Sequence, residues 1–240
     1  MDIHALFARI ANLYIVVNEN GLVIVDAGFG NAAPLVIRKI RELRRAPSDV
    51  RLIFLTHAHM DHVGGAAELR RLTGAPIALH RADAAKARAG KHNLPSGRGS
   101  AGKALEHTFN GLHLKFRYEA FEPDLFFDEG DTLREFGLNA RVLRTPGHTL
   151  GSLTLALPER ALLVGDAIIN QFRVAMPLYG EDAALAFDSV RKIAGLRPRI
   201  LYSGHGKPFS GDALTRYTQA KKLLLAAGQI REPKTGKHIE

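Results

Sequence analysis

Four short apolar segments of this chain each run into a polar turn that carries histidine or aspartate near glycine. Short apolar runs bounded by turn residues predict buried strands. Because ligand sites in α/β proteins form at the carboxyl ends of strands, we expect the four polar turns to meet at one edge of the fold. The four segments are residues 52–55, 140–144, 161–164 and 200–203.

The turn after the first of these strands, residues 56–62, carries the most specific motif, with three histidines and one aspartate inside six residues. The other three turns add His148, Asp166 and His205. Five of the 11 histidines therefore lie in the four turns, whereas independent solvated histidines would be scattered more evenly. This concentration of imidazole and carboxylate groups predicts a metal site.

The residue types restrict the metal chemistry without naming the metal. The chain has no cysteine, so disulfides and thiolate ligands are excluded. Imidazole and carboxylate suit zinc, iron, manganese or cobalt. Seven ligands are too many for one catalytic metal with an open position, but they suffice for two ions about 3.5–4 Å apart. We therefore expect two divalent ions, with zinc favoured over iron or manganese. The candidate ligands are His57, His59, Asp61, His62, His148, Asp166 and His205.

Strands and helices are predicted to alternate in both halves of the chain. The segment 90–111 is rich in glycine, serine and basic residues, which predicts a long loop or mobile cap. We expect one domain over residues 1–228, with a basic insertion at 81–118 and a polar tail at 229–240. The other expected strands are 13–17 and 22–25 (a hairpin), 77–79, 113–118, 132–136 and 152–157; the expected helices are 32–45, 66–72, 82–89, 182–194 and 212–226.

Charge and hydropathy narrow the class of partner. The net charge is +9, which attracts anions such as nucleic acid, acidic lipid or an anionic metabolite. The segment 81–117 concentrates basic residues, which could draw an anionic small-molecule substrate to the protein. The alternative is that these residues only form a solvated basic surface. No apolar stretch approaches the roughly 20 residues that cross a bilayer, and the first residues do not resemble a secretory signal. We expect a cytoplasmic protein that has no membrane partner and that could form a homodimer. A nucleic-acid partner is disfavoured, because no groove-reading helix or aromatic platform is evident.

The combined motifs resemble the metallo-β-lactamase superfamily. The similarity spans about residues 13–209 and is carried by residues 25–28, 56–62, 145–149, 165–166 and 204–206. It implies an α/β fold, a four-layer αβ/βα sandwich in which two mixed β-sheets pack face to face with helices outside. It also implies that the metals lie at one edge of the two sheets.

The resemblance assigns roles to the candidate ligands. His57, His59 and His148 would bind one metal; Asp61, His62 and His205 would bind the other, and Asp166 would bridge them. Asp26 resembles the outer carboxylate that orients a metal ligand. Asp61 and Asp166 are the expected catalytic residues. Lys207, Phe172 and Tyr179 are candidate substrate contacts.

The implied reaction is hydrolysis of an ester, thioester or lactone by a hydroxide held between two metals, as in glyoxalase II-like thioesterases and small lactone hydrolases. Ile169 stands where acyl-homoserine lactonases often carry tyrosine, which weakens that assignment. Two alternatives remain open. One is an iron persulfide dioxygenase-like oxidoreductase that uses a single metal. The other is a phosphodiesterase or another nucleic-acid-acting member of the superfamily.

Overall fold

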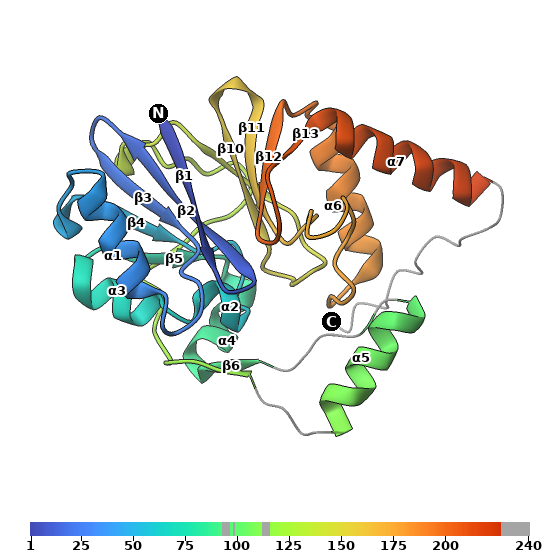
Figure 1. Ribbon diagram of the computed structural model, residues 1–240, viewed down its shortest axis with the longest axis horizontal. Helices are drawn as coiled ribbons and strands as arrows, with labels where there is room; N and C mark the ends of the chain where they lie inside the picture. The colour runs from blue at the N-terminus through green and yellow to red at the C-terminus, as the bar shows by residue number, and fades with distance from the viewer. Residues whose placement is uncertain (93–96, 98, 112–115, 227–240) are drawn as a thin grey trace.

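Two β-sheets pack face to face and carry helices on their outer sides, which gives the four layers visible in Figure 1. This computed structural model describes residues 1–92, 97, 99–111 and 116–226. The first sheet has the strand order β1-β2-β3-β4-β5-β8, and the second has the order β13-β12-β11-β10-β9. Both sheets are mixed, because β3, β4, β5 and β8 are parallel, as are β11 and β12, whereas the other neighbours are antiparallel.

The elements divide between the two halves of the chain. The first sheet is built from β1 (Asp2–Ala8), β2 (Ala11–Asn18), β3 (Gly21–Val25), β4 (Val50–Phe54), β5 (Ile77–Leu79) and β8 (Leu125–Phe126). The second is built from β9 (Arg141–Arg144), β10 (Leu153–Leu157), β11 (Ala161–Gly165), β12 (Ile200–Ser203) and β13 (Phe209–Ser210), and a small separate pair consists of β6 (Lys91–His92) and β7 (Phe116–Arg117). The helices are α1 (Ala33–Glu42), α2 (Met60–Val63), α3 (Ala66–Thr73), α4 (Ala84–Ala89), α5 (Gly99–Gly111), α6 (Ala183–Gly195) and α7 (Gly211–Ala226).

Strand periodicity explains why the core has three parts. Side chains alternate between the two faces of a strand. On β2, Leu13 and Ile15 face the core beneath α1 and α3, whereas Tyr14 and Val16 face the core between the sheets. The same alternation on β11 divides its side chains between that central core and the core beneath α6 and α7. Strands buried on both faces are therefore continuously apolar, which is the pattern that the sequence shows.

Two secondary-structure predictions are wrong. Residues 132–136 were expected to form a strand, but residues 134–136 form a 3₁₀ helix that ends at Gly137 in a left-handed conformation (φ 76°). The segment 90–111 was expected to be a loop, yet it contains β6 and the helix α5. The glycines of α5 disfavour a helix by propensity. For this reason the alanines and other helix-forming residues between them did not lead to the prediction of a helix.

Other predictions are only partly covered by the described residues. In the predicted strand 113–118, residues 113–115 lie outside the described residues, and residues 116–117 form β7. The predicted tail 229–240 also lies outside them. Strands β1, β8 and β13 were not predicted.

In the part of the chain that is described, no helix is both long and apolar enough to cross a bilayer.

Candidate metal centre

The four polar turns meet at one edge of the two sheets, below the strands in Figure 1. His57 and His59 follow β4, and Asp61 and His62 lie in the one-turn helix α2 that comes next. From the second sheet, His148 lies between β9 and β10, Asp166 follows β11 and His205 follows β12. The strands of both sheets thus deliver their carboxyl ends to one place, as the sequence predicted.

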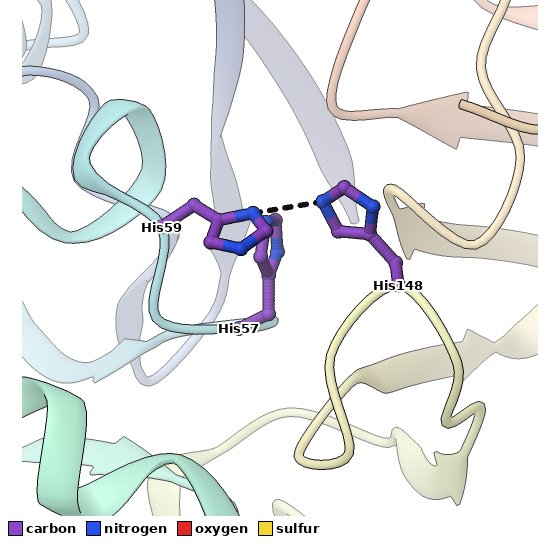
Figure 2. Close-up of side chains that lie close together, drawn as sticks. All are labelled: His57, His59 and His148. Atoms are coloured by element: carbon purple, nitrogen blue, oxygen red, sulfur yellow. Dashed lines mark hydrogen bonds between the residues drawn. The ribbon is translucent and has the colours of Figure 1, made fainter. Parts of the chain in front are cut away.

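His57, His59 and His148 form the first cluster, shown in Figure 2. One ring nitrogen from each side chain lies within 4.8 Å of the others. His59 Nδ1 and His148 Nε2 are 2.8 Å apart. All three side chains are buried, with exposed fractions of 1–3%. The cluster joins the two sheets, because its first two histidines come from one sheet and the third comes from the other.

Asp61, His62 and His205 form the second cluster. His205 Nε2 lies 3.3 Å from Asp61 Oδ2. Asp166 lies between the two clusters, because its Oδ2 is 3.4 Å from His148 Nε2 and 3.1 Å from His205 Nε2. All seven predicted ligands are therefore brought together at one site.

The outward-facing ring nitrogens have partners of their own. His62 Nδ1 donates to Asp26 Oδ2 at 2.8 Å, and His205 Nδ1 donates to the Ile10 carbonyl at 2.7 Å. His148 Nδ1 donates to the Tyr179 carbonyl at 3.2 Å. Such bonds place the proton on Nδ1 and leave Nε2 directed at the centre, which is how metal-binding histidines are oriented in proteins.

Atoms without partners test whether a metal fits these residues. His57 Nε2, His59 Nε2 and Asp166 Oδ1 are buried and have no hydrogen-bond partner among the described residues. Leaving buried polar atoms unsatisfied costs about 1–3 kcal/mol each. Neutral imidazole nitrogen and carboxylate oxygen are also ligands that divalent metals accept. The orphaned atoms and the donor set therefore both fit divalent cations.

The pKa values of the candidate ligands shift in opposite directions: those of His57 and His59 are lowered, whereas those of His62 and His205 are raised. Burial lowers the pKa of His57 and His59, and the neighbouring imidazoles lower it further, so both rings are neutral. Burial also opposes charge on His62 and His205, but the surrounding carboxylates outweigh it and raise the pKa of His62 to about 9 and of His205 to about 11. Burial tends to raise the pKa of Asp166, but the positive charges of His205 and His62 hold it well below its usual range. Without metal, protons on His62 and His205 thus neutralise the carboxylates.

Gly204 leaves room for the centre. A Cβ at this position would overlap Asp166 Oδ1 and lie 2.6 Å from His62 Cε1. No side chain larger than glycine's hydrogen therefore fits here without displacing a candidate ligand. The glycine next to His205, noted in the sequence as a turn residue, is required by this close approach.

Asn12 holds the His205 turn in place and was missed by the sequence reasoning. Its Nδ2 donates to the Ser203 carbonyl at 2.9 Å and to the Gly206 carbonyl at 2.6 Å. Its backbone N donates to the Gly204 carbonyl at 2.7 Å. The available signal was a single asparagine at the start of an apolar strand, where a buried amide must find partners.

The candidate substrate contacts do not all lie together. Phe172 and Lys207 line a cavity of about 620 Å³ beside the His205 turn, together with Phe7 and Ile10. Phe172 is 96% exposed. Tyr179 is not among the residues that line this cavity; its ring lies 5.8 Å from the ring of His148 instead.

The basic segment is less open to anions than its sequence suggests. Within residues 81–117 only Asp83 and Glu106 oppose the basic side chains, but the fold brings other acids to them. Lys86 pairs with Glu181 at 2.7 Å, and Arg88 pairs with Glu122 at 2.7 Å. Part of the predicted positive field is therefore neutralised by acids that lie far away in the sequence.

A family model for the metallo-beta-lactamase superfamily matches residues 6–205, and the chain belongs to this superfamily. The probable metallo-hydrolase YflN of Bacillus subtilis is 26% identical over 227 residues, covering 87% of this chain and 85% of that protein. A hydroxyacylglutathione hydrolase of Cereibacter sphaeroides is 29% identical over 213 residues, covering 85% of this chain and 70% of that protein. A metallo-beta-lactamase family protein of Thermus thermophilus aligns with a TM-score of 0.65 at 25% identity, covering 94% of this chain and 79% of that chain. The predicted family and fold class are confirmed, and the chain is a metallo-hydrolase of this superfamily.

Proposed function

We propose that this metallo-hydrolase cleaves an ester, thioester or lactone with two divalent cations, zinc being favoured. The observation that carries the proposal is the convergence of seven side chains from four turns, with buried nitrogen and oxygen atoms that lack hydrogen-bond partners among the described residues. Two divalent cations bound there would supply an activated water near neutral pH and would polarise the bond to be cleaved.

Each group of residues has a proposed task. His57, His59 and His148 hold one cation, and Asp61, His62 and His205 hold the other. Asp166 is proposed to contact both, which its place between the clusters supports. The Nδ1 atoms of His62, His148 and His205 are hydrogen-bonded to outer partners, so these three imidazoles are pre-oriented and lose little freedom on binding.

Asp26 is proposed to orient His62. Its carboxylate is 1% exposed and also accepts from the backbone N of Thr56 at 2.7 Å. It thereby joins His62 to the turn that carries His57. A proton held on His62 Nδ1 by this carboxylate leaves Nε2 available as a ligand.

The cavity beside the His205 turn is the proposed substrate site. Phe7, Ile10 and Phe172 give it an apolar wall, and Lys207 supplies a cation at its rim. This combination suits a small molecule with an apolar portion and an anionic group. Gly206, which directly follows His205, also lines the cavity, so a substrate bound there would lie beside the turn that carries this candidate ligand.

The proposal for esters and thioesters rests on the leaving group. Among the described residues, the carboxylates at the centre are candidate ligands or partners of one, so none of them is a separate general acid; His92 and Tyr179 are other titratable side chains with rings beside the clusters. Alkoxide and thiolate leaving groups need less protonation than amines do. The Cereibacter sphaeroides relative is a hydroxyacylglutathione hydrolase, which supports the same substrate class.

Hydrolysis by chelated and reconstituted protein tests this proposal. Protein stripped of metal and reloaded with zinc, manganese or iron is assayed on hydroxyacylglutathione, simple thioesters, aryl esters, lactones and phosphodiesters. We expect cleavage of at least one ester, thioester or lactone, lost on chelation and restored by metal. His148→Ala should abolish the activity, whereas His107→Ala, at an exposed position on α5, should leave it unchanged.

Three results would contradict the proposal. Metal-loaded protein that cleaved no ester, thioester or lactone would refute the proposed hydrolase activity. Cleavage of the phosphodiester alone would favour the nucleic-acid-acting alternative. One iron per chain with oxygen consumption on a persulfide would instead favour the dioxygenase alternative.

A further inference from the structure

Asp83 is a fully buried carboxylate that lies outside the set of candidate ligands. It precedes α4, and its exposed fraction is 0%. Its Oδ2 accepts from the backbone N of Ala58 at 2.9 Å and from Thr149 Oγ1 at 2.7 Å. A buried charge is costly unless it is paired and hydrogen-bonded, so these contacts account for its place in the fold.

The two partners of Asp83 Oδ2 belong to the two turns that build the first cluster. Ala58 stands between His57 and His59, and Thr149 directly follows His148. These turns come from different sheets. A single carboxylate oxygen thus joins the backbone next to both halves of the cluster.

A second link runs through Lys86. Its Nζ lies 2.6 Å from Asp83 Oδ1 and 2.7 Å from Glu181 Oε1. Glu181 Oε2 accepts from the backbone N of Leu150 at 2.6 Å, and the backbone N of Glu181 donates to the His148 carbonyl at 3.1 Å. The His148 turn is therefore held from both sides by one chain of charged groups.

Close backbone packing also brings Asp83 to this turn. A Cβ at Gly151 would lie 2.5 Å from Asp83 Cγ. The absence of a side chain at Gly151 thus makes space for the carboxylate beside Thr149. The sequence gives little hint of this, because an aspartate before a short helix is usually a helix cap.

We propose that Asp83 is a positioning residue that fixes the His148 turn against the His57 and His59 turn, and thereby sets the metal affinity of the first cluster. This inference rests on the proposed function, because it requires that the cluster bind metal. The hydrogen bonds and ion pair of Asp83 among the described residues go to Ala58, Thr149 and Lys86 and not to a candidate ligand side chain, so its effect passes through the two turns. Ligand nitrogens held at fixed separations bind a cation more tightly than those on turns that must be ordered on binding.

The fold does not depend on Asp83 alone. The backbone N of Leu153 donates to the Thr56 carbonyl at 2.8 Å, which joins the same two regions independently. The central core between the sheets lies elsewhere. We therefore expect variants of the Asp83 network to fold, with the loss concentrated in the geometry of the first cluster.

The test uses metal binding by full-length protein. Zn²⁺ affinity is measured by competition with a chromophoric chelator, and Co²⁺ substitution reports coordination geometry through its visible absorption. The variants are Asp83→Asn, in which an amide replaces the carboxylate beside the Lys86 ammonium, and Thr149→Val, in which a methyl group replaces the hydroxyl. Thr149→Ser keeps a hydroxyl at this position, and Thr218→Val, which removes the hydroxyl that donates to the Thr215 carbonyl within α7, is the external control.

We expect Asp83→Asn and Thr149→Val to weaken the binding of one metal equivalent by about tenfold or more and to change the Co²⁺ spectrum. Thr149→Ser should recover both properties, and Thr218→Val should match the wild type. Folded Thr149→Val protein with wild-type affinity and spectrum would overturn the inference, even if Asp83→Asn failed to fold. Wild-type protein that bound no metal would instead overturn the proposed function, and this inference with it.

Discussion

Asp26→Asn tests how an outer carboxylate controls a candidate ligand. Asp26 Oδ1 accepts from the backbone N of Thr56 at 2.7 Å, and Oδ2 faces His62 Nδ1 at 2.8 Å. Asparagine keeps one oxygen for Thr56 but presents an NH₂ group to His62 Nδ1. Because two donors cannot bond each other, the neutral form of His62, which is the form that binds metal, would carry its proton on Nε2, the atom directed at the centre. Asn also tolerates the left-handed backbone of this position (φ 62°), so backbone strain is not the cause.

The size of the effect follows from the bond that is lost. A hydrogen bond to a charged group contributes about 1.5–3 kcal/mol, and each 1.4 kcal/mol is about tenfold in affinity. We therefore expect Zn²⁺ affinity to fall by about 10- to 100-fold, the range found for outer partners of metal-binding histidines. The assay is chelator competition on protein whose fold is checked by circular dichroism. Asp124→Asn is the control, since Asp124 accepts from the backbone N of Ile77 away from the centre. Folded Asp26→Asn protein with wild-type affinity would refute the reasoning.

Three further predictions concern the same centre. Gly204→Ala should lower Zn²⁺ affinity at least tenfold, because the new methyl overlaps Asp166; unchanged affinity by competition would contradict this. Asn12→Ala should lower the free energy of unfolding of metal-free protein by about 1–3 kcal/mol in urea titrations, because the Gly206 carbonyl loses this donor and the Ser203 carbonyl keeps the Tyr14 hydroxyl but loses the amide; a change below about 0.5 kcal/mol would count against it. Zn²⁺ binding at pH 7.5 should release more than one proton, because the pKa values of His62 (about 9) and His205 (about 11) keep both charged without metal. Apparent affinity should therefore rise with pH, and calorimetric heats independent of buffer ionisation would contradict this.

The pH dependence of the metal-free protein follows from the same raised pKa. The folded pKa of His62, about 9, lies above its ordinary value of 6.5. The stabilisation from its carboxylate pairs is therefore complete below about pH 6.5 and is lost as the pH rises through 9. Bound metal replaces those protons, so loaded protein should lose this dependence.

The ligand set was predictable because each member follows an apolar strand within a few residues. Strand direction then brings the turns together, since the carboxyl ends of parallel strands lie at one edge. The motif at residues 57–62 specified most of the centre locally. His148, Asp166 and His205 could be added because each stands beside a glycine just past an apolar strand.

The supporting groups could not be predicted in the same way. Asn12 and Asp83 reach turns that are distant in the sequence, 194 and 66 residues away in the contacts to Gly206 and Thr149. No local pattern encodes such a pairing. Helix α5 was missed for a different reason: its glycines argue against a helix by propensity, although the fold forms one there.

X-ray diffraction from crystals of zinc-loaded protein, with anomalous data collected at the zinc edge, tests the central claim most directly. We predict two anomalous peaks about 3.5–4 Å apart, one among His57, His59 and His148 and the other among Asp61, His62 and His205, with zinc–nitrogen distances of about 2.0–2.1 Å. Stoichiometrically loaded protein whose zinc peaks lay away from these side chains would contradict the assignment of this edge of the fold as the metal centre.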